Sequence, residues 1–207
     1  MKKVSTLILA FIFLVCPYSV FAERTQKSTP QNSGLTERQE KIITEAVRNV
    51  KDRHASAIHS GVARVHRELG LPGNLQYWER VATAVSAVES SGKHKAESSK
   101  GALGLMQLMP VTAQDVCKVG SNQLFDPKIS VYCGMSLIKK LRESSTKTPS
   151  ESWDWVWMAY NRGEKGAELH LERSCGKCSP QATQRLLASD SFVLSIRFAI
   201  SLLNNQA

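Results

Sequence analysis

The residue of this sequence best suited to acid–base chemistry is Glu89, at the end of a predicted helix. The helix begins near Asn74, and an apolar face recurs along it at three- and four-residue steps. Its inward residues are Val81, Ala84, Val85 and Val88. Glu89 follows Val85 by four positions, so its side chain should lean toward the same face. Burial and the negative end of the helix dipole both disfavour the ionised form, and we expect a raised pKa. A carboxyl group protonated near pH 7 suits a general acid for a glycosidic oxygen. A single Glu at a helix end is nevertheless more often structural or solvated.

The order and spacing of three further sequence blocks favour a functional role for Glu89 over a structural one. Glu89 is followed by Ser90, and after a short gap by the run SSKGALGLMQLMPVTA at 98–113. Asp126-Pro127 and the run AYNRG at 159–163 come later. Over about 75–165 this pattern resembles the soluble lytic transglycosylase family of the lysozyme-like superfamily. The small size and apparent export signal also resemble members that serve secretion or conjugation machines.

The resemblance implies one catalytic residue, Glu89, and a set of substrate-binding residues. The substrate-binding residues are Ser98, Gln107, Met109, Tyr160 and Asn161. In the family, the position of Ser98 helps to hold the N-acetyl group of muramic acid, and the aromatic at Tyr160 sits near the acid. Each has a structural alternative: Ser98 as a turn residue, Met109 as core packing, and Tyr160 as a core residue bonded to backbone.

The resemblance also implies a mechanism that needs one carboxyl group, whereas most glycosidases need two. Glu89 would protonate the leaving oxygen with help from the substrate's N-acetyl oxygen. It would then deprotonate the C6 hydroxyl, which closes a 1,6-anhydro ring on N-acetylmuramic acid. Neither Glu168 nor Glu172 has the spacing of a second groove carboxylate. The sequence departs from the family at Gly92-Lys93-His94 and at Arg162, and the resemblance fades after Gly163.

Four cysteines remain if the N-terminal leader is removed: Cys117, Cys133, Cys175 and Cys178. In an oxidising compartment an even count indicates two disulfides with three possible connectivities. We favour Cys117 with Cys133 and Cys175 with Cys178, because each pair is local in sequence. A four-cysteine zinc site is the alternative, but only one close pair is present. We therefore expect no metal and no cofactor.

The elements that must position these residues are almost all helical. Thr36 and Gln39 form a potential capping box at the start of an amphipathic helix that extends to Leu69, with an expected interruption near Ser60-Gly61. Its histidines, His54, His59 and His66, are interpreted as surface or stripe residues. Further helices are predicted at about 74–90, 111–118, 127–144, 151–161 and 181–204, with room for a small hairpin between 91 and 108. The fold class is therefore mainly α: a lysozyme-like globular domain with an extra N-terminal amphipathic helix.

The N-terminus predicts the compartment. A positive start, an apolar run at 7–15 and Val20-Phe21-Ala22 indicate a signal peptide at 1–22. An uncleaved anchor and a lipoprotein at Cys16 are the alternatives. We expect a disordered tether at 23–35, a helical segment at 36–72 and the lysozyme-like domain at 73–204. The net charge of +9 falls to +7 without the two leader lysines, and such a protein is attracted to polyanions.

These observations predict a monomeric periplasmic enzyme that cleaves peptidoglycan glycan strands. A lysozyme-type hydrolase of the same fold is the first alternative. A catalytically idle scaffold that binds glycan, or secretion or conjugation subunits through the 36–69 helix, is the second. Export and the lack of an aromatic–basic motif argue against nucleic acid.

Overall fold

The computed structural model describes residues 33–145 and 152–205. Within these ranges the chain is helical and contains no strand, which confirms the mainly α prediction. The elements in chain order are α1 (Glu37–Leu69), α2 (Leu75–Ser90), α3 (Pro110–Cys117), the 3-10 helix η1 (Ser121–Phe125), α4 (Pro127–Ser145), α5 (Trp153–Arg162), α6 (Glu164–Cys175), α7 (Pro180–Ala188) and α8 (Ser191–Asn204).

Helix α1 is a single long helix, so the expected interruption near Ser60-Gly61 is wrong. Thr36 and Gln39 form the predicted capping box, and Gly70 ends the helix in the left-handed conformation. Gly61 lies instead where α1 crosses α4. A Cβ at this position would come within 2.6 Å of Val131 Cγ1. The glycine therefore permits a close helix crossing, which a sequence pattern cannot distinguish from a helix break.

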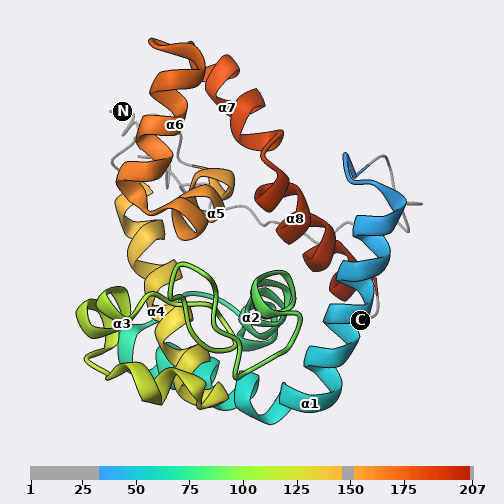
Figure 1. The fold of residues 1–207 in the computed structure, drawn as a ribbon, viewed down its shortest axis with the longest axis vertical. Helices are drawn as coiled ribbons and strands as arrows, with labels where there is room; N and C mark the ends of the chain where they lie inside the picture. Colours follow the sequence, from blue (N-terminus) through green and yellow to red (C-terminus); the bar gives the residue numbers. More distant parts are fainter. Residues whose placement is uncertain (1–32, 146–151, 206–207) are drawn as a thin grey trace, which may run out of the picture.

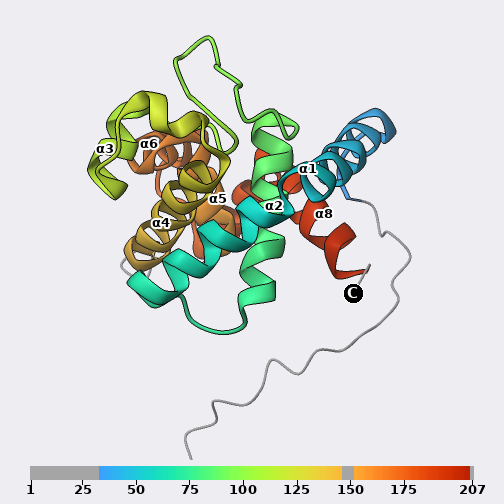
Figure 2. The same cartoon turned by 90° about the horizontal axis from the view of Figure 1, so that it is seen from below.

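Helix α2 occupies the centre of the molecule. It packs against α1 on one side and α8 on another, and α1 also packs against α4; Figure 2 shows α1 and α2 crossing. Of the four residues predicted for the inward face of α2, Val81, Ala84 and Val85 are fully inaccessible and Val88 is partly buried. The helix ends at Ser90, and Ser91 adopts the left-handed conformation as its cap. Glu89 therefore lies in the last turn of a helix that is held on several sides.

The C-terminal third differs from the prediction in two places. The helix expected at 181–204 is two helices, α7 and α8, because Asp190 caps a new helix start through the N–H groups of Phe192 and Val193. Helix α6 was not predicted at all. Only Ala167 of α6 is fully buried, so the helix lacks the apolar stripe that periodicity detects. Figure 1 shows α6 and α7 as an arm that extends away from α2 and α3.

The segment between α2 and α3 holds two isolated antiparallel bridges in place of a hairpin, Glu97 with Leu103 and Leu103 with Leu108. Two disulfides follow. One joins Cys117 of α3 to Cys133 of α4, and the other joins Cys175, the last residue of α6, to Cys178 in the turn before α7. This is the pairing favoured from sequence.

The expected signal peptide at 1–22 and most of the expected tether at 23–35 lie outside the described residues. Among the residues that are described, no single helix is long and apolar enough to cross a membrane. Helices α7 and α8 meet the criterion of length and composition only as a pair, bent by 69°.

Candidate active site

Glu89 is largely buried at the C-terminal end of α2. Removal from water penalises the charged carboxylate, and this burial raises the pKa of Glu89 from 4.5 to about 8. The raised pKa agrees in direction with the expectation from sequence, and burial is its cause. The carboxyl group is therefore protonated at neutral pH and can donate a proton.

Tyr160 of α5 lies close enough to Glu89 for the charge of the Glu89 carboxylate to affect the ionisation of the Tyr160 hydroxyl. Burial raises the pKa of Tyr160 well above 10, and the negative charge of Glu89 raises it further. The Tyr160 hydroxyl donates a hydrogen bond to the carbonyl oxygen of Met106 at 2.9 Å, and the residue is 9% exposed. Tyr160 is thus a core residue whose hydroxyl is bonded to backbone, which is the structural alternative considered from sequence. Its side chain also lines the cleft that contains Glu89.

Hydrogen bonds fix the segment after Glu89 onto α2. The Ser90 hydroxyl donates to the carbonyl oxygen of Leu105 at 2.7 Å and lies near that of Ser86 at 3.0 Å. Gln107 has a positive φ of 49°, and its side-chain amide donates to the carbonyl oxygens of Ala96 and Gly104. Gln107 therefore holds the loop together with its NH₂ group, a role that the sequence did not predict.

Helix α1 supports the same region from the other side. His54 is 7% exposed, and its Nε2 atom lies 2.9 Å from the carbonyl oxygen of Gly92, to which it donates. The His94 ring meets the His54 ring edge-on at 5.5 Å between centroids. The segment Gly92-Lys93-His94, where the sequence departs from the family, thus packs on α1. The N-terminal helix therefore supports the turn that follows Glu89.

Ser98, Met109 and Asn161 are more accessible. Ser98 is part of a turn in which its hydroxyl oxygen accepts from the N–H of Ala102 at 2.9 Å. Met109 stands just before α3 and is 40% exposed, so it is not a core residue. Asn161 is exposed in the last turn of α5.

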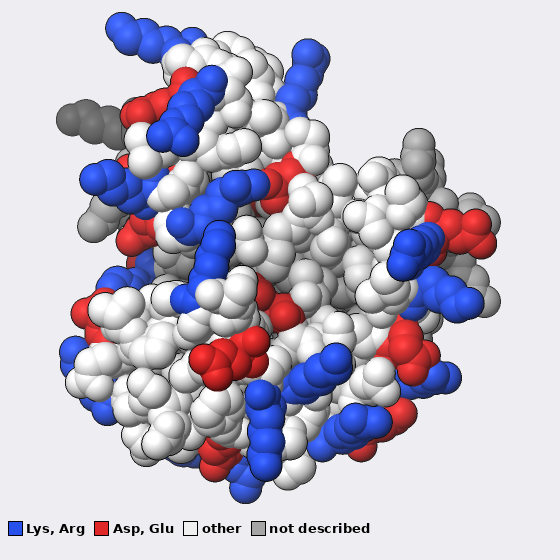
Figure 3. Space-filling model, viewed as in Figure 1, with Lys and Arg blue, Asp and Glu red and all other residues white. Residues whose placement is uncertain are grey.

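All six candidate residues line one cleft of about 980 Å³. The cleft is walled by the 98–109 segment, α3, the second half of α4, and the junction of α5 with α6. Figure 3 shows charged side chains of both signs across this face of the molecule. The cleft is large enough for several sugar rings of a polysaccharide chain.

The cleft also contains four charged residues that were not expected from the sequence: Lys100, Asp115, Lys140 and Glu164. Asp115 pairs with Lys140 at 2.7 Å, and this hydrogen bond lowers the pKa of Asp115. Arg162, a departure from the family whose positive charge was expected in the groove, also lines the cleft. No spacing rule could place Asp115 or Glu164 here, because α3 and α6 reach the cleft only through tertiary packing.

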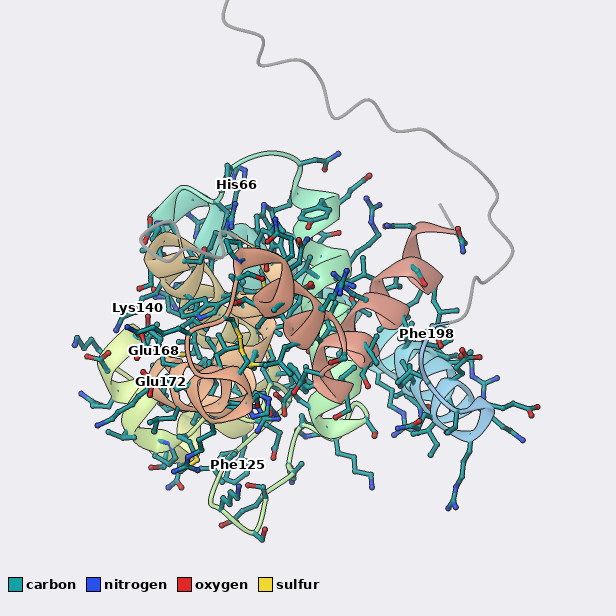
Figure 4. The ribbon with its side chains drawn as sticks, turned by 90° about the horizontal axis from the view of Figure 1, so that it is seen from above. His66, Phe125, Lys140, Glu168, Glu172 and Phe198 are labelled. Atoms are coloured by element: carbon teal, nitrogen blue, oxygen red, sulfur yellow. A yellow bond between two sulfur atoms is a disulfide. The ribbon has the colours of Figure 1, made fainter. Side chains whose placement is uncertain are left out.

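The two acids considered from sequence, Glu168 and Glu172, do not line the cleft and are exposed. Figure 4 shows both on α6, on the side of the molecule opposite Phe198 of α8. Within residues 33–145 and 152–205, no group of three or more His, Cys, Asp or Glu side chains is arranged to hold a metal ion.

Comparisons with known proteins agree with this arrangement. Residues 73–174 match the family described as the transglycosylase SLT domain, so the match continues through α6 beyond the point where the resemblance faded. The chain is 35% identical over 83 residues to a transglycosylase of Enterobacteria phage PRD1, covering 34% of this chain and 30% of that protein. It is 33% identical over 131 residues to a protein named as a soluble lytic murein transglycosylase of Haemophilus influenzae, covering 60% of this chain and 20% of that protein.

Two solved structures share the fold. An inactive mutant of the lytic transglycosylase Slt from Pseudomonas aeruginosa superposes with a TM-score of 0.56 and 18% identity, over 76% of this chain and 25% of that one. The 70 kDa soluble lytic transglycosylase of Escherichia coli gives a TM-score of 0.55 and 18% identity, over 81% of this chain and 30% of that one. The chain thus spans less than a third of the length of each of these proteins.

Proposed function

This chain belongs to the transglycosylase SLT family of lysozyme-like proteins, and on that premise we propose that it is a peptidoglycan lytic transglycosylase. Its substrate is the β-1,4 bond between N-acetylmuramic acid and N-acetylglucosamine. Glu89 is the sole acid and base, and Ser98, Gln107, Met109, Tyr160 and Asn161 bind the glycan. The observation that supports this proposal most directly is a largely buried carboxyl group, with a pKa of about 8, in a cleft of about 980 Å³.

The proposed reaction uses that carboxyl group twice. Protonated Glu89 gives its proton to the glycosidic oxygen, and the bond from that oxygen to C1 of the muramic acid breaks. The N-acetyl oxygen of the same sugar stabilises the electron-poor C1. The Glu89 carboxylate then takes the proton of the C6 hydroxyl, and O6 bonds to C1. The products are a free 4-hydroxyl and a 1,6-anhydro ring, no water is consumed, and Glu89 is protonated again.

Product analysis tests this proposal against its nearest alternative. We expect digestion of purified sacculi to release muropeptides with 1,6-anhydro ends, detected by mass spectrometry as a loss of one water relative to reducing ends. A hydrolase is the second candidate because Asp115 and Glu164 also line the cleft, and a second carboxylate could activate water. Reducing ends would establish the hydrolase, and no release at all would favour an idle scaffold.

The pH dependence of the reaction follows from the pKa of Glu89. Only the protonated carboxyl group can begin the reaction, so kcat/KM should fall as pH rises through about 8. The rate on soluble glycan strands is measured between about pH 5 and 10, with circular dichroism at each pH as a control for unfolding. A rate that increases across pH 8 would contradict an acid role for Glu89.

The place of action and the partners are part of the same proposal. Peptidoglycan lies outside the cytoplasm, so the enzyme acts in the periplasm after export by its N-terminal leader. Secretion or conjugation subunits are proposed partners on the outer face of α1, whose exposed side chains are mostly polar or charged.

A further inference from the structure

Arg162 occupies a fixed position in the wall of the cleft. It is the last residue of α5, two positions after Tyr160, and its side chain is 38% exposed. Its Nη2 atom donates to Oδ2 of Asp190 at 2.8 Å. The α5 and α8 helices are therefore joined by this ion pair at the rim of the cleft.

Asp190 is suited to hold the guanidinium in one place. Its side chain is only 6% exposed, and the carboxylate also accepts from the N–H groups of Phe192 and Val193 at the start of α8. Burial acts to raise the pKa of Asp190, but the hydrogen bonds from Arg162 and from these N–H groups lower it overall. The carboxylate is thus charged and rigid, whereas an isolated surface ion pair would be mobile and contribute little to stability.

A guanidinium that is already ordered is a good donor to a second anion. Arginine has five N–H donors in a planar fork, and the bond to Asp190 uses one of its nitrogen atoms. Because the side chain is held before the ligand arrives, binding costs less conformational entropy. The planar fork matches a carboxylate, which it can bind through two parallel hydrogen bonds.

The charges around Arg162 in the cleft are of both signs and partly cancel. Lys140 is neutralised by Asp115, and Glu164 carries the opposite charge two residues from Arg162. The cleft as a whole is therefore not strongly positive, and an anion would be recognised by direct hydrogen bonds rather than by a long-range field. Lys100 lines the cleft from the 98–109 segment and adds a second cation.

We propose that Arg162, held by Asp190, is a specificity-determining residue that binds a carboxylate of the glycan strand. This inference rests on the proposed function, because it takes peptidoglycan as the ligand. The sugar rings of that polymer are neutral, and its acidic groups are carboxylates of two sources. One is the lactyl carboxylate of muramic acid, which is free on strands without peptides. The other is the set of carboxylates on the stem peptide, which is attached through the lactyl group.

The test measures affinity without turnover, so that its outcome is independent of the reaction proposed above. Binding is measured by calorimetry in the Glu89→Gln background, with and without Arg162→Gln. The probes are peptide-bearing strands, strands stripped of peptides by an amidase, and stripped strands whose lactyl carboxylates have been converted to neutral methylamides. Arg185→Gln is the matched control, since Arg185 is exposed on α7 and does not line the cleft.

We expect Arg162→Gln to weaken binding about tenfold to at least one carboxylate-bearing probe and to leave the neutral probe unchanged. A loss confined to stripped strands identifies the lactyl carboxylate, and a loss confined to peptide-bearing strands identifies the stem. Arg162→Lys keeps the positive charge but lacks the planar fork. Its affinity for that probe should therefore lie between the affinities of the protein with Arg162 and of Arg162→Gln. An equal loss on all three probes, or no loss on any, overturns the proposal. Failure of the proposed function would appear separately, as a wild type that forms no 1,6-anhydro ends.

Discussion

Replacement of Glu89 by glutamine is expected to lower the rate of muropeptide release by about a thousandfold or more while the fold is retained. Glutamine has nearly the same shape as a protonated glutamic acid, so the packing in the last turn of α2 should persist. Its amide can neither protonate the leaving oxygen nor accept the proton of the C6 hydroxyl. Because the proposed reaction uses the carboxyl group in both steps, one substitution removes both. The rate is measured on purified sacculi by quantitative mass spectrometry.

The same substitution should make the protein more stable at alkaline pH. The pKa of Glu89 is about 8 in the folded protein, against an ordinary value of 4.5 for a solvated carboxyl group, so the folded state binds more protons between these values. The free energy of unfolding of the wild type therefore falls as pH rises from about 4.5 to 8. Glutamine does not ionise, so the variant avoids this loss and should exceed the wild type by roughly 1–3 kcal/mol near pH 9.

Glu168→Gln is the matched control for both measurements. Glu168 is an exposed acid of α6 that does not line the cleft, so its substitution should change neither the rate nor the stability. A merely structural Glu89 would give the opposite pattern, with activity lost only to the extent that stability is lost. Loss of activity combined with a gain in stability is the signature of a carboxyl group kept buried for chemistry.

The five substrate-binding candidates came from the resemblance to the family and not from any local signal, and they line the same cleft as Glu89. The position of Glu89 was predictable from local signals, because the apolar spacing of α2 placed it at the end of a buried face. The capping box of Thr36 and Gln39 likewise depends only on residues adjacent in sequence. In each case the interaction that fixes the structure lies within one turn or one segment.

The missed features depend on contacts between distant segments. Helix α6 buries only Ala167 fully, so nothing in its own sequence shows an inward face. The pairing of Arg162 with Asp190 joins α5 to the start of α8, and the same aspartate breaks the helix predicted at 181–204. Gly61 was interpreted as a possible helix break, but it lies in contact with Val131 of α4. A larger residue at this position would collide with Val131. Sequence periodicity records which residues are buried but not which partner buries them.

A second large effect is expected at Gly104, where alanine should strongly destabilise the fold. Gly104 has a φ of +79°, and a Cβ built there would lie 1.9 Å from the carbonyl oxygen of Leu124. The obstacle is backbone, and Leu124 is fully buried in η1, so it has no room to move. The segment must shift and lose hydrogen bonds such as the one from the Gly104 N–H to Ala96. We expect a loss of about 3–5 kcal/mol and a fall in Tm of roughly 10 °C.

Gly101 separates the steric cause from the conformational one. It has nearly the same φ, +82°, but a Cβ there meets nothing within 4 Å. Gly101→Ala should therefore cost only about 1 kcal/mol, the strain of a positive φ in an L-residue. Thermal unfolding of both variants by calorimetry measures the difference, and equal losses would rule out the contact with Leu124 as the cause. Because Gly104 is hydrogen-bonded to Gln107 and bridged to the loop at Ala96, its displacement would also move the wall that faces Glu89. The Gly104→Ala protein that remains folded should therefore be less active per molecule than Gly101→Ala. Such a result would show that the close packing of Gly104 on Leu124 also positions the cleft wall that faces Glu89.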